Sequence, residues 1–172
     1  MLRLITPCEA YLPSYTEAYD EYCAYPRPAG NPLIDPRACN LLARYERYRN
    51  ACDLPEGWVG MTTYWLVDDE NQRFLGQIDI RHELTEHLLR YGGHVGYAIR
   101  LGEWNKGYGT LMLSLALPRA KVLGIGRCLI TCDDDNPGSA RVMEKNGFVL
   151  GDKIDNVING RTIITRRYWK TL

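Results

Sequence analysis

The hydrophobic positions of this chain change period along its length, which predicts a mixed order of strands and helices. Short apolar or alternating runs are typical of strands at 2–6, 58–67, 74–81, 95–101, 128–131, 148–154 and 162–169. Wider apolar spacing indicates helices at 8–23, 35–49, 107–123 and 136–146. No repeat, low-complexity tract or linker interrupts this order, so we expect a single domain over residues 1–172.

Two breaks in the pattern predict turns. The proline-rich stretch 26–32 separates the first two helices. The pair Asn159-Gly160 lies between the last two strands and is typical of a tight hairpin turn.

Charge and composition exclude several classes of protein. The 21 Lys and Arg residues balance 21 Asp and Glu residues and the pI is about 6.8, so no overall charge favours nucleic acid as a partner. No run approaches the ~20 apolar residues of a membrane span, and the apolar run after Met1 is too short for a signal peptide. We expect a cytoplasmic protein that binds neither nucleic acid nor membrane.

The six cysteines do not form a metal or disulfide pattern. They lie at 8, 23, 39, 52, 128 and 132, no two of them have the C-x-x-C spacing, and the three histidines lie elsewhere, at 82, 87 and 94. Scattered thiols of this kind are typical of reduced cysteines in a cytosolic protein. We therefore expect no metal site.

A glycine-rich turn at residues 104–110 lies between the predicted strand 95–101 and the next helix. Such a turn directs several backbone N–H groups and the positive end of the helix dipole at one point, which suits a phosphate. Gly107 and Gly109 lack a Cβ atom, so the backbone can approach a pyrophosphate closely. Lys106 adds a positive charge or is an ordinary surface lysine. Thr110 either reaches a phosphate with its hydroxyl or only starts the helix.

A second unit of the same kind follows about 27 residues later. Residues 135–140 begin a helix directly after an apolar strand, and Asn136 is a candidate N-cap for that helix. Two such units side by side indicate a site for a long phosphorylated cofactor such as coenzyme A.

These motifs resemble those of the GNAT N-acetyltransferase superfamily. The acetyl-coenzyme A signature of that superfamily is Arg/Gln-x-x-Gly-x-Gly/Ala, and here Gly107 and Gly109 fill the small positions while Trp104 replaces the Arg or Gln. Tryptophan followed by a basic residue and Gly-Tyr-Gly resembles the branch that includes ribosomal-protein alanine acetyltransferases. The segment 136–148 also matches the second cofactor helix and its Glu-Lys-x-Gly-Phe ending.

The resemblance implies a fold and a cofactor. The expected fold is α/β (α+β): a mixed, mainly antiparallel central sheet of about six to seven strands, with helices on both faces and a splayed pair of strands four and five. The implied cosubstrate is acetyl-coenzyme A, with the pantetheine arm along the fourth strand and a bulge near Ala98–Ile99 polarising the acetyl carbonyl. The implied cofactor-binding residues are Ile99, Leu101, Asn105, Lys106, Gly107, Tyr108, Gly109, Thr110, Asn136 and Ser139.

The sequence identifies less specifically the residues that would deprotonate the acceptor amine. An amine is mostly protonated at neutral pH, so some group or water chain must take its proton before attack. Glu83 and His94 are the polar residues closest to the expected acetyl position, and each has a solvated or structural role as its alternative. Asp79 and His82 are alternates on the third strand.

The general acid of the family is also replaced. A tyrosine usually lies seven residues after the asparagine of the second cofactor helix, and Met143 occupies that position here. Coenzyme A leaves as a thiolate with a pKa near ~8.5, so its departure needs little proton help. Tyr97 is another possible acid.

The predicted function is transfer of an acetyl group from acetyl-coenzyme A to a primary amine, by direct attack in a ternary complex. The acceptor is a small molecule or the N-terminus of a peptide or protein, and a homodimer is left open. The alternative is a non-catalytic acyl-coenzyme A-binding regulatory module. A dinucleotide-binding oxidoreductase does not fit, because Met112 stands where a third Gly or Ala is expected.

Overall fold

The computed structural model describes residues 1–25, 31–158 and 160–172. Most of the predicted break at 26–32, and Asn159 of the predicted hairpin turn, therefore lie outside the described residues.

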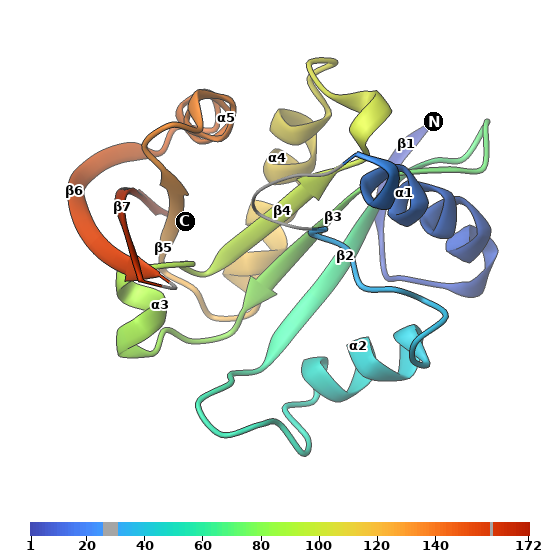
Figure 1. Cartoon of the computed structure of the whole chain (residues 1–172), viewed down its shortest axis with the longest axis horizontal. Coiled ribbons are helices and arrows are strands. Elements are labelled where there is room, and N and C mark those ends of the chain that lie inside the picture. The colour runs from blue at the N-terminus through green and yellow to red at the C-terminus, as the bar shows by residue number, and fades with distance from the viewer. Residues whose placement is uncertain (26–30, 159) are drawn as a thin grey trace.

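Within the described residues, seven strands form two antiparallel sheets. The first sheet has the order β1 (Leu2–Ile5), β2 (Met61–Asp68), β3 (Arg73–Arg81), β4 (Val95–Ile99). The second has the order β5 (Arg127–Asp133), β7 (Arg161–Thr171), β6 (Val149–Ile158). Figure 1 shows the two sheets side by side, with β4 and β5 at the edges that meet. The predicted fold class is confirmed, with the central sheet divided into two parts.

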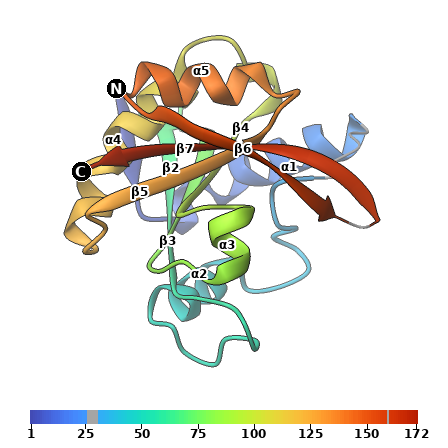
Figure 2. The ribbon, with the colours of Figure 1, turned by 90° about the vertical axis from the view of Figure 1, so that its left-hand side faces the viewer.

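The helices cover both faces of this arrangement. They are α1 (Leu12–Ala24), α2 (Leu41–Arg49), α3 (Glu86–Arg90), α4 (Tyr108–Val122) and α5 (Pro137–Lys145), with short 3₁₀ turns η1 (Glu9–Tyr11) and η2 (Leu101–Glu103). In Figure 2 α5 lies above the three-stranded sheet and α3 lies below it.

The start of one helix differs from the sequence prediction, and one short helix was not predicted. The second helix begins at Leu41 and not near residue 35, because the Asn40 side chain accepts a hydrogen bond from the Ala43 N–H and caps the helix there. Helix α3 was not predicted. Thr85 caps it by accepting from the Leu88 N–H, and its five residues are too short to show a hydrophobic period.

Side chains of β2 and β3 face two separate cores, with a β-bulge between Leu66 and Val67 shifting the register. Ile78 and Ile80 pack with α4 and α5 in one core. Trp65 and Phe74 pack with α1 and α2 in the other, where the Trp65 ring stacks on that of Tyr15 at 4.8 Å between centroids. The strand period also places the polar side chains of β3 on this second, aromatic side.

Strands β4 and β5 touch at one end and then separate. They share an isolated bridge between Gly93 and Ile130, and the His94 N–H donates to the Leu129 carbonyl at 2.8 Å. Gly93 has φ +64°, and a Cβ atom there would lie 2.6 Å from the Leu129 oxygen, so the close approach requires glycine. Beyond this junction β5 pairs with β7 and not with β4. The predicted splay of the fourth and fifth strands is confirmed.

Candidate active site

A cleft of about 250 Å³ opens between β4 and β5 beyond their junction. It is lined by strand residues on both sides, by the start of α5 and by the loop before β4: Arg81, Tyr91, Gly92, Val95, Gly96, Tyr97, Thr131, Cys132, Asp133, Asn136 and Ser139. Of the residues predicted from the sequence, the structure brings Asn136 and Ser139 into this cleft.

One edge of the cleft is formed by free backbone groups of β4. The bonds between β3 and β4 use every second residue, including His94, whose carbonyl accepts from Arg81, and Arg100, whose N–H donates to Leu75. Strand geometry turns the intervening groups toward β5, where no ladder partner takes them. They are the backbone groups of residues 95 and 97 and the N–H of residue 99.

Three expectations about this edge are corrected. The bulge expected near Ala98–Ile99 is absent from the β3–β4 pairing, which runs in unbroken register from Val95 to Ile99. Strand β4 ends at Ile99, and Leu101 lies in the 3₁₀ turn η2 that follows. The Ile99 carbonyl is already bonded by the Tyr22 hydroxyl and by the Trp104 indole N–H, the latter at 2.8 Å. Trp104 thus secures the end of β4 from the position where the family signature has Arg or Gln.

The glycine-rich turn forms the start of α4 as predicted. Gly107 is the N-cap with φ +85°, and no atom lies within 4 Å of where its Cβ would be. The first intrahelical bond runs from the Leu111 N–H to the Gly107 carbonyl, so the N–H groups of residues 108–110 have no partner within the helix. Asn105, at φ +62°, shapes the turn just before it. This helix start can therefore donate several backbone hydrogen bonds to an anion.

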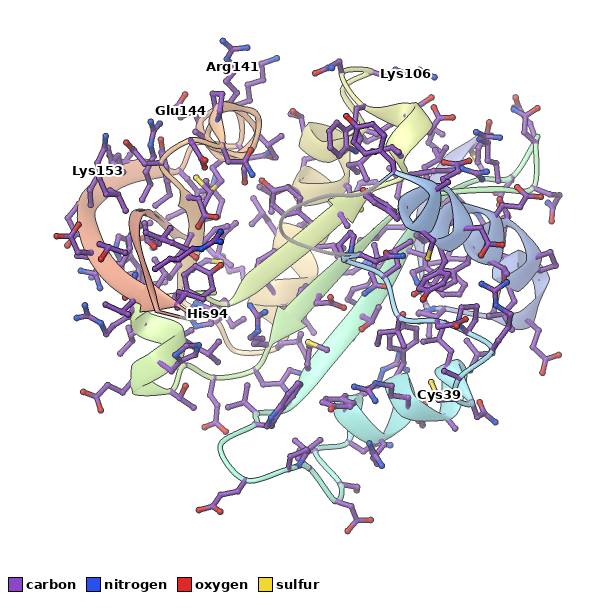
Figure 3. The ribbon with its side chains drawn as sticks, viewed as in Figure 1. Cys39, His94, Lys106, Arg141, Glu144 and Lys153 are labelled. Atoms are coloured by element: carbon purple, nitrogen blue, oxygen red, sulfur yellow. The ribbon has the colours of Figure 1, made fainter. Side chains whose placement is uncertain are left out.

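Other residues of the turn also have structural partners. Gly109 faces α5, and a Cβ atom there would lie 3.2 Å from Val142 Cγ2, so close packing of α4 on α5 also requires this glycine. Lys106, at the tip of the turn in Figure 3, pairs with Glu103 at 2.9 Å. The Tyr108 side chain packs against the core, and the Thr110 carbonyl accepts from the Asn146 amide.

The start of α5 forms the opposite wall of the cleft. The Asn136 side chain accepts from the Ser139 N–H at 3.0 Å, so it is the N-cap that its sequence predicts. The Tyr97 and Ser139 hydroxyls are 2.7 Å apart and join β4 to α5. Burial raises the pKa of Tyr97 to about 12, which keeps its hydroxyl protonated at neutral pH. Met143 is fully buried in the core and has no polar role.

Neither residue predicted as the proton acceptor lines the cleft. Glu83 is exposed in the loop between β3 and α3. His94 is buried at the β4–β5 junction, where its Nδ1 accepts from the Leu129 N–H at 3.0 Å (Figure 3). Burial and the nearby Arg81 lower the pKa of His94, so the ring is neutral with its proton on Nε2. Holding the two strands together is the role this geometry supports for His94.

Several cleft residues carried no signal in the sequence. Arg81 donates to the Gly92 and Gly93 carbonyls at 3.1 and 2.9 Å and shapes the closed end of the cleft. Tyr91 and Cys132 come from a loop and from a strand that looked like ordinary core. Only the pairing of the strands brings them together, so no local pattern could have identified them.

The described residues contain no cluster of His, Cys, Asp or Glu suited to a metal ion. They also contain no helix long and apolar enough to cross a membrane.

Splayed strands, a glycine-rich helix start and a second capped helix together define the fold of an acetyltransferase. The model of the acetyltransferase (GNAT) domain family matches residues 2–149, and the chain belongs to this family. The expected superfamily is thereby confirmed. No match was found among curated protein sequences.

Solved structures share this fold over almost the whole chain. RimL, a ribosomal-protein alpha-N-acetyltransferase solved with coenzyme A, is 16% identical with a TM-score of 0.72, covering 99% of this chain and 94% of that one. The yncA protein of Salmonella typhimurium, solved with acetyl-coenzyme A, is 18% identical with a TM-score of 0.67, covering 99% and 93%. A spermidine N-acetyltransferase SpeG chimera from Vibrio cholerae and hSSAT is 16% identical with a TM-score of 0.65, covering 99% and 95%. At these identities the likeness shows the fold.

Proposed function

We propose that this domain transfers the acetyl group of acetyl-coenzyme A to a primary amine by direct attack in a ternary complex. The cleft between β4 and β5 is the observation that carries the proposal, because it joins a free strand edge to the start of α5, and the glycine-rich start of α4 follows β4 in the chain. Membership of the GNAT family supports the chemistry. No observation favours the alternative of a non-catalytic acyl-coenzyme A-binding module.

The residues around the cleft fit this cosubstrate. The open space at Gly107 and the free N–H groups of residues 108–110 would hold the pyrophosphate, with Asn105 shaping the turn. The edge of β4 at Tyr97 and Ile99 would hold the pantetheine arm, together with Asn136 and Ser139 across the cleft. Lys106, Tyr108, Gly109 and Thr110 complete this part of the site, and Leu101 supports it from η2.

Acetyl-coenzyme A supplies an acetyl group activated as a thioester. The free backbone N–H groups of β4 are the donors available to polarise the acetyl carbonyl, and one such donor is typically worth ~10²–10³ in rate. The protonated Tyr97 hydroxyl lies at the same edge and is the candidate donor of a proton to the leaving thiolate. Glu83 and His94 are the residues that the sequence predicts to accept the amine proton, but neither lines the cleft.

The acceptor is a small amine or the N-terminus of a peptide or protein. Both kinds occur among the structural neighbours, whose names describe a ribosomal-protein and a spermidine acetyltransferase. The six cysteines are all free, which supports a reducing, cytoplasmic location. A homodimer stays a prediction that size-exclusion chromatography would test.

The test is release of free thiol from acetyl-coenzyme A with a panel of amines: putrescine, spermidine, n-butylamine and peptides beginning with Ser or Ala. Thiol release that depends on one amine class, with the acetylated product found by mass spectrometry, is the expected result. Tight acetyl-coenzyme A binding in calorimetry without thiol release from any amine would instead indicate the binding module.

A further inference from the structure

A carboxylate on β3 is held on the aromatic side of the first sheet, beside the strand that borders the cleft. Asp79 accepts hydrogen bonds from the Thr63 hydroxyl at 2.7 Å and from the Gln77 amide at 3.2 and 3.1 Å. Gln77 is itself held by the Tyr45 hydroxyl at 2.7 Å and by the Trp65 indole. This network fixes the direction in which the carboxylate points.

The negative charge of Asp79 has no ionic partner in the described part of the chain. All three of its hydrogen bonds come from neutral donors. Arg81, the nearest cation on its own strand, donates instead to the Gly92 and Gly93 carbonyls. Burial raises the pKa of the Asp79 carboxyl, and the bonds from Thr63 and Gln77 offset only part of this effect. A partly buried carboxylate without an ionic partner reduces stability.

A glycine on β4 lies between this carboxylate and the cleft. Asp79 is paired in register with Gly96, and opposed residues of an antiparallel pair carry their side chains on the same face. Gly96 lines the cleft and has no side chain to separate the two. The nearest atoms to a Cβ built at Gly96 belong to the Arg81 guanidinium, at 3.5 Å, so this guanidinium lies beside Gly96 at the cleft. The carboxylate and the cleft are therefore separated by the width of one strand.

We propose that Asp79 binds the ammonium group of the acceptor and receives its proton, on the side of β4 opposite α4 and α5. This inference rests on the proposed acetyl transfer and names the class of acceptor: a primary amine that binds as its cation. The ammonium gives one proton to the carboxylate, and its nitrogen bonds to the acetyl carbon as the carbon–sulfur bond breaks. The nitrogen then loses a second proton to water, the thiolate takes up one proton, and Asp79 passes its proton to water, so one proton is released per turnover.

Asp79→Asn is the variant that tests this assignment, with Asp155→Asn as its matched control. Asp155 lies exposed on β6, away from the cleft, and the control removes the same charge from the chain. For the amine that wild type acetylates best, we expect Asp79→Asn to lower kcat/KM by at least ~10²-fold, the usual contribution of a general base. Its acetyl-coenzyme A affinity by calorimetry should be unchanged, which together with a cooperative thermal transition shows that the variant is folded.

The pH profile separates a chemical role from a structural one. Wild-type kcat/KM should fall at low pH with an apparent pKa above the ordinary Asp value, and this limb should be absent in Asp79→Asn. The groups that face Asp79 from the neighbouring elements are Tyr15 of α1, Tyr45 of α2, Thr63 of β2, and Gln77 and Arg81 of β3. Among these only Asp79 can lose a proton between about pH 4 and 8.

Three outcomes would overturn the inference. In the first, Asp79→Asn keeps more than a third of the wild-type kcat/KM at pH 7. In the second, Glu83→Gln produces the 10²-fold loss in its place. In the third, wild type acetylates no amine in the panel, which refutes the proposed function as well. If wild type and Asp79→Asn are both active, only the role of Asp79 is refuted and the proposed acetyl transfer stands.

Discussion

Replacing Gly107 by Asp tests where an anion binds at the start of α4. Gly107 is the N-cap, and the space around its missing Cβ is empty within 4 Å. Its φ of +85° is unfavourable for most residues, but Asn and Asp adopt this region more readily than other side chains do. Gly107→Asn is therefore the matched control, because it has the same shape and backbone cost without the charge. Gly109 is a poorer choice, since a Cβ there would press on Val142.

The expected effect follows from the distance between charges. A carboxylate at Gly107 would lie about 5 Å from a phosphate bound by the helix start, and one pair of unit charges at that distance repels by about 1–3 kcal/mol at an effective dielectric constant of 20–80. This corresponds to roughly 5- to 150-fold weaker acetyl-coenzyme A binding for Gly107→Asp than for Gly107→Asn. A negative charge at a helix N-terminus is itself favourable by about 0.3–1 kcal/mol, so the Asp variant should be no less stable than the Asn variant.

Isothermal titration calorimetry of both variants with acetyl-coenzyme A measures this difference directly. Raising the salt concentration should reduce it, because exposed charges are screened within about 8 Å at physiological ionic strength. Equal affinities of two folded variants at low salt would refute the placement of the pyrophosphate at residues 105–110.

Three further predictions concern the proton acceptor and the junction of the sheets. Glu83→Gln should keep near-full kcat at pH 7, since Glu83 is exposed and does not line the cleft; a loss of ~10²–10⁴ would instead identify it as a single base. Gly93→Ala should reduce the free energy of unfolding by about 2–4 kcal/mol, because φ is +64° and the new Cβ would lie 2.6 Å from the Leu129 oxygen. The control Gly124→Ala, at φ +89° with no atom within 4 Å of its Cβ, should reduce it by only about 1–2 kcal/mol. Equal losses for the two variants in urea unfolding would contradict this. The pKa of Asp79 is raised in the folded state, so the folded protein holds this proton more tightly than the unfolded chain and stability should fall as pH rises from about 4 through the raised value. A wild-type Tm that does not fall relative to that of Asp79→Asn over this pH range would contradict it.

Local chemistry determined the parts of the site that depend on neighbouring residues in the chain. The start of α4 needs only the glycines at 107 and 109 followed by a helix-forming run, and the structure places it where the sequence predicted. The start of α5 likewise follows from Asn136, whose side chain bonds a backbone group three residues further on. Strand positions followed from their hydrophobic period, although β4 ends at Ile99 because η2 begins soon after it.

Tertiary structure decided the rest, because it depends on groups distant in the sequence. Whether the fourth and fifth strands pair or separate is determined by the contact of Gly93 with β5, and by the pairing of β5 with a strand more than 25 residues away in the chain. The alternating pattern of β3 predicted only that Asp79 faces the side of the sheet opposite to Ile80 and His82. It could not say which face lies beside the cleft, or that the residue across from Asp79 would be a glycine. A strand pattern indicates which side chains share a face, but only the folded sheet determines which other elements that face packs against.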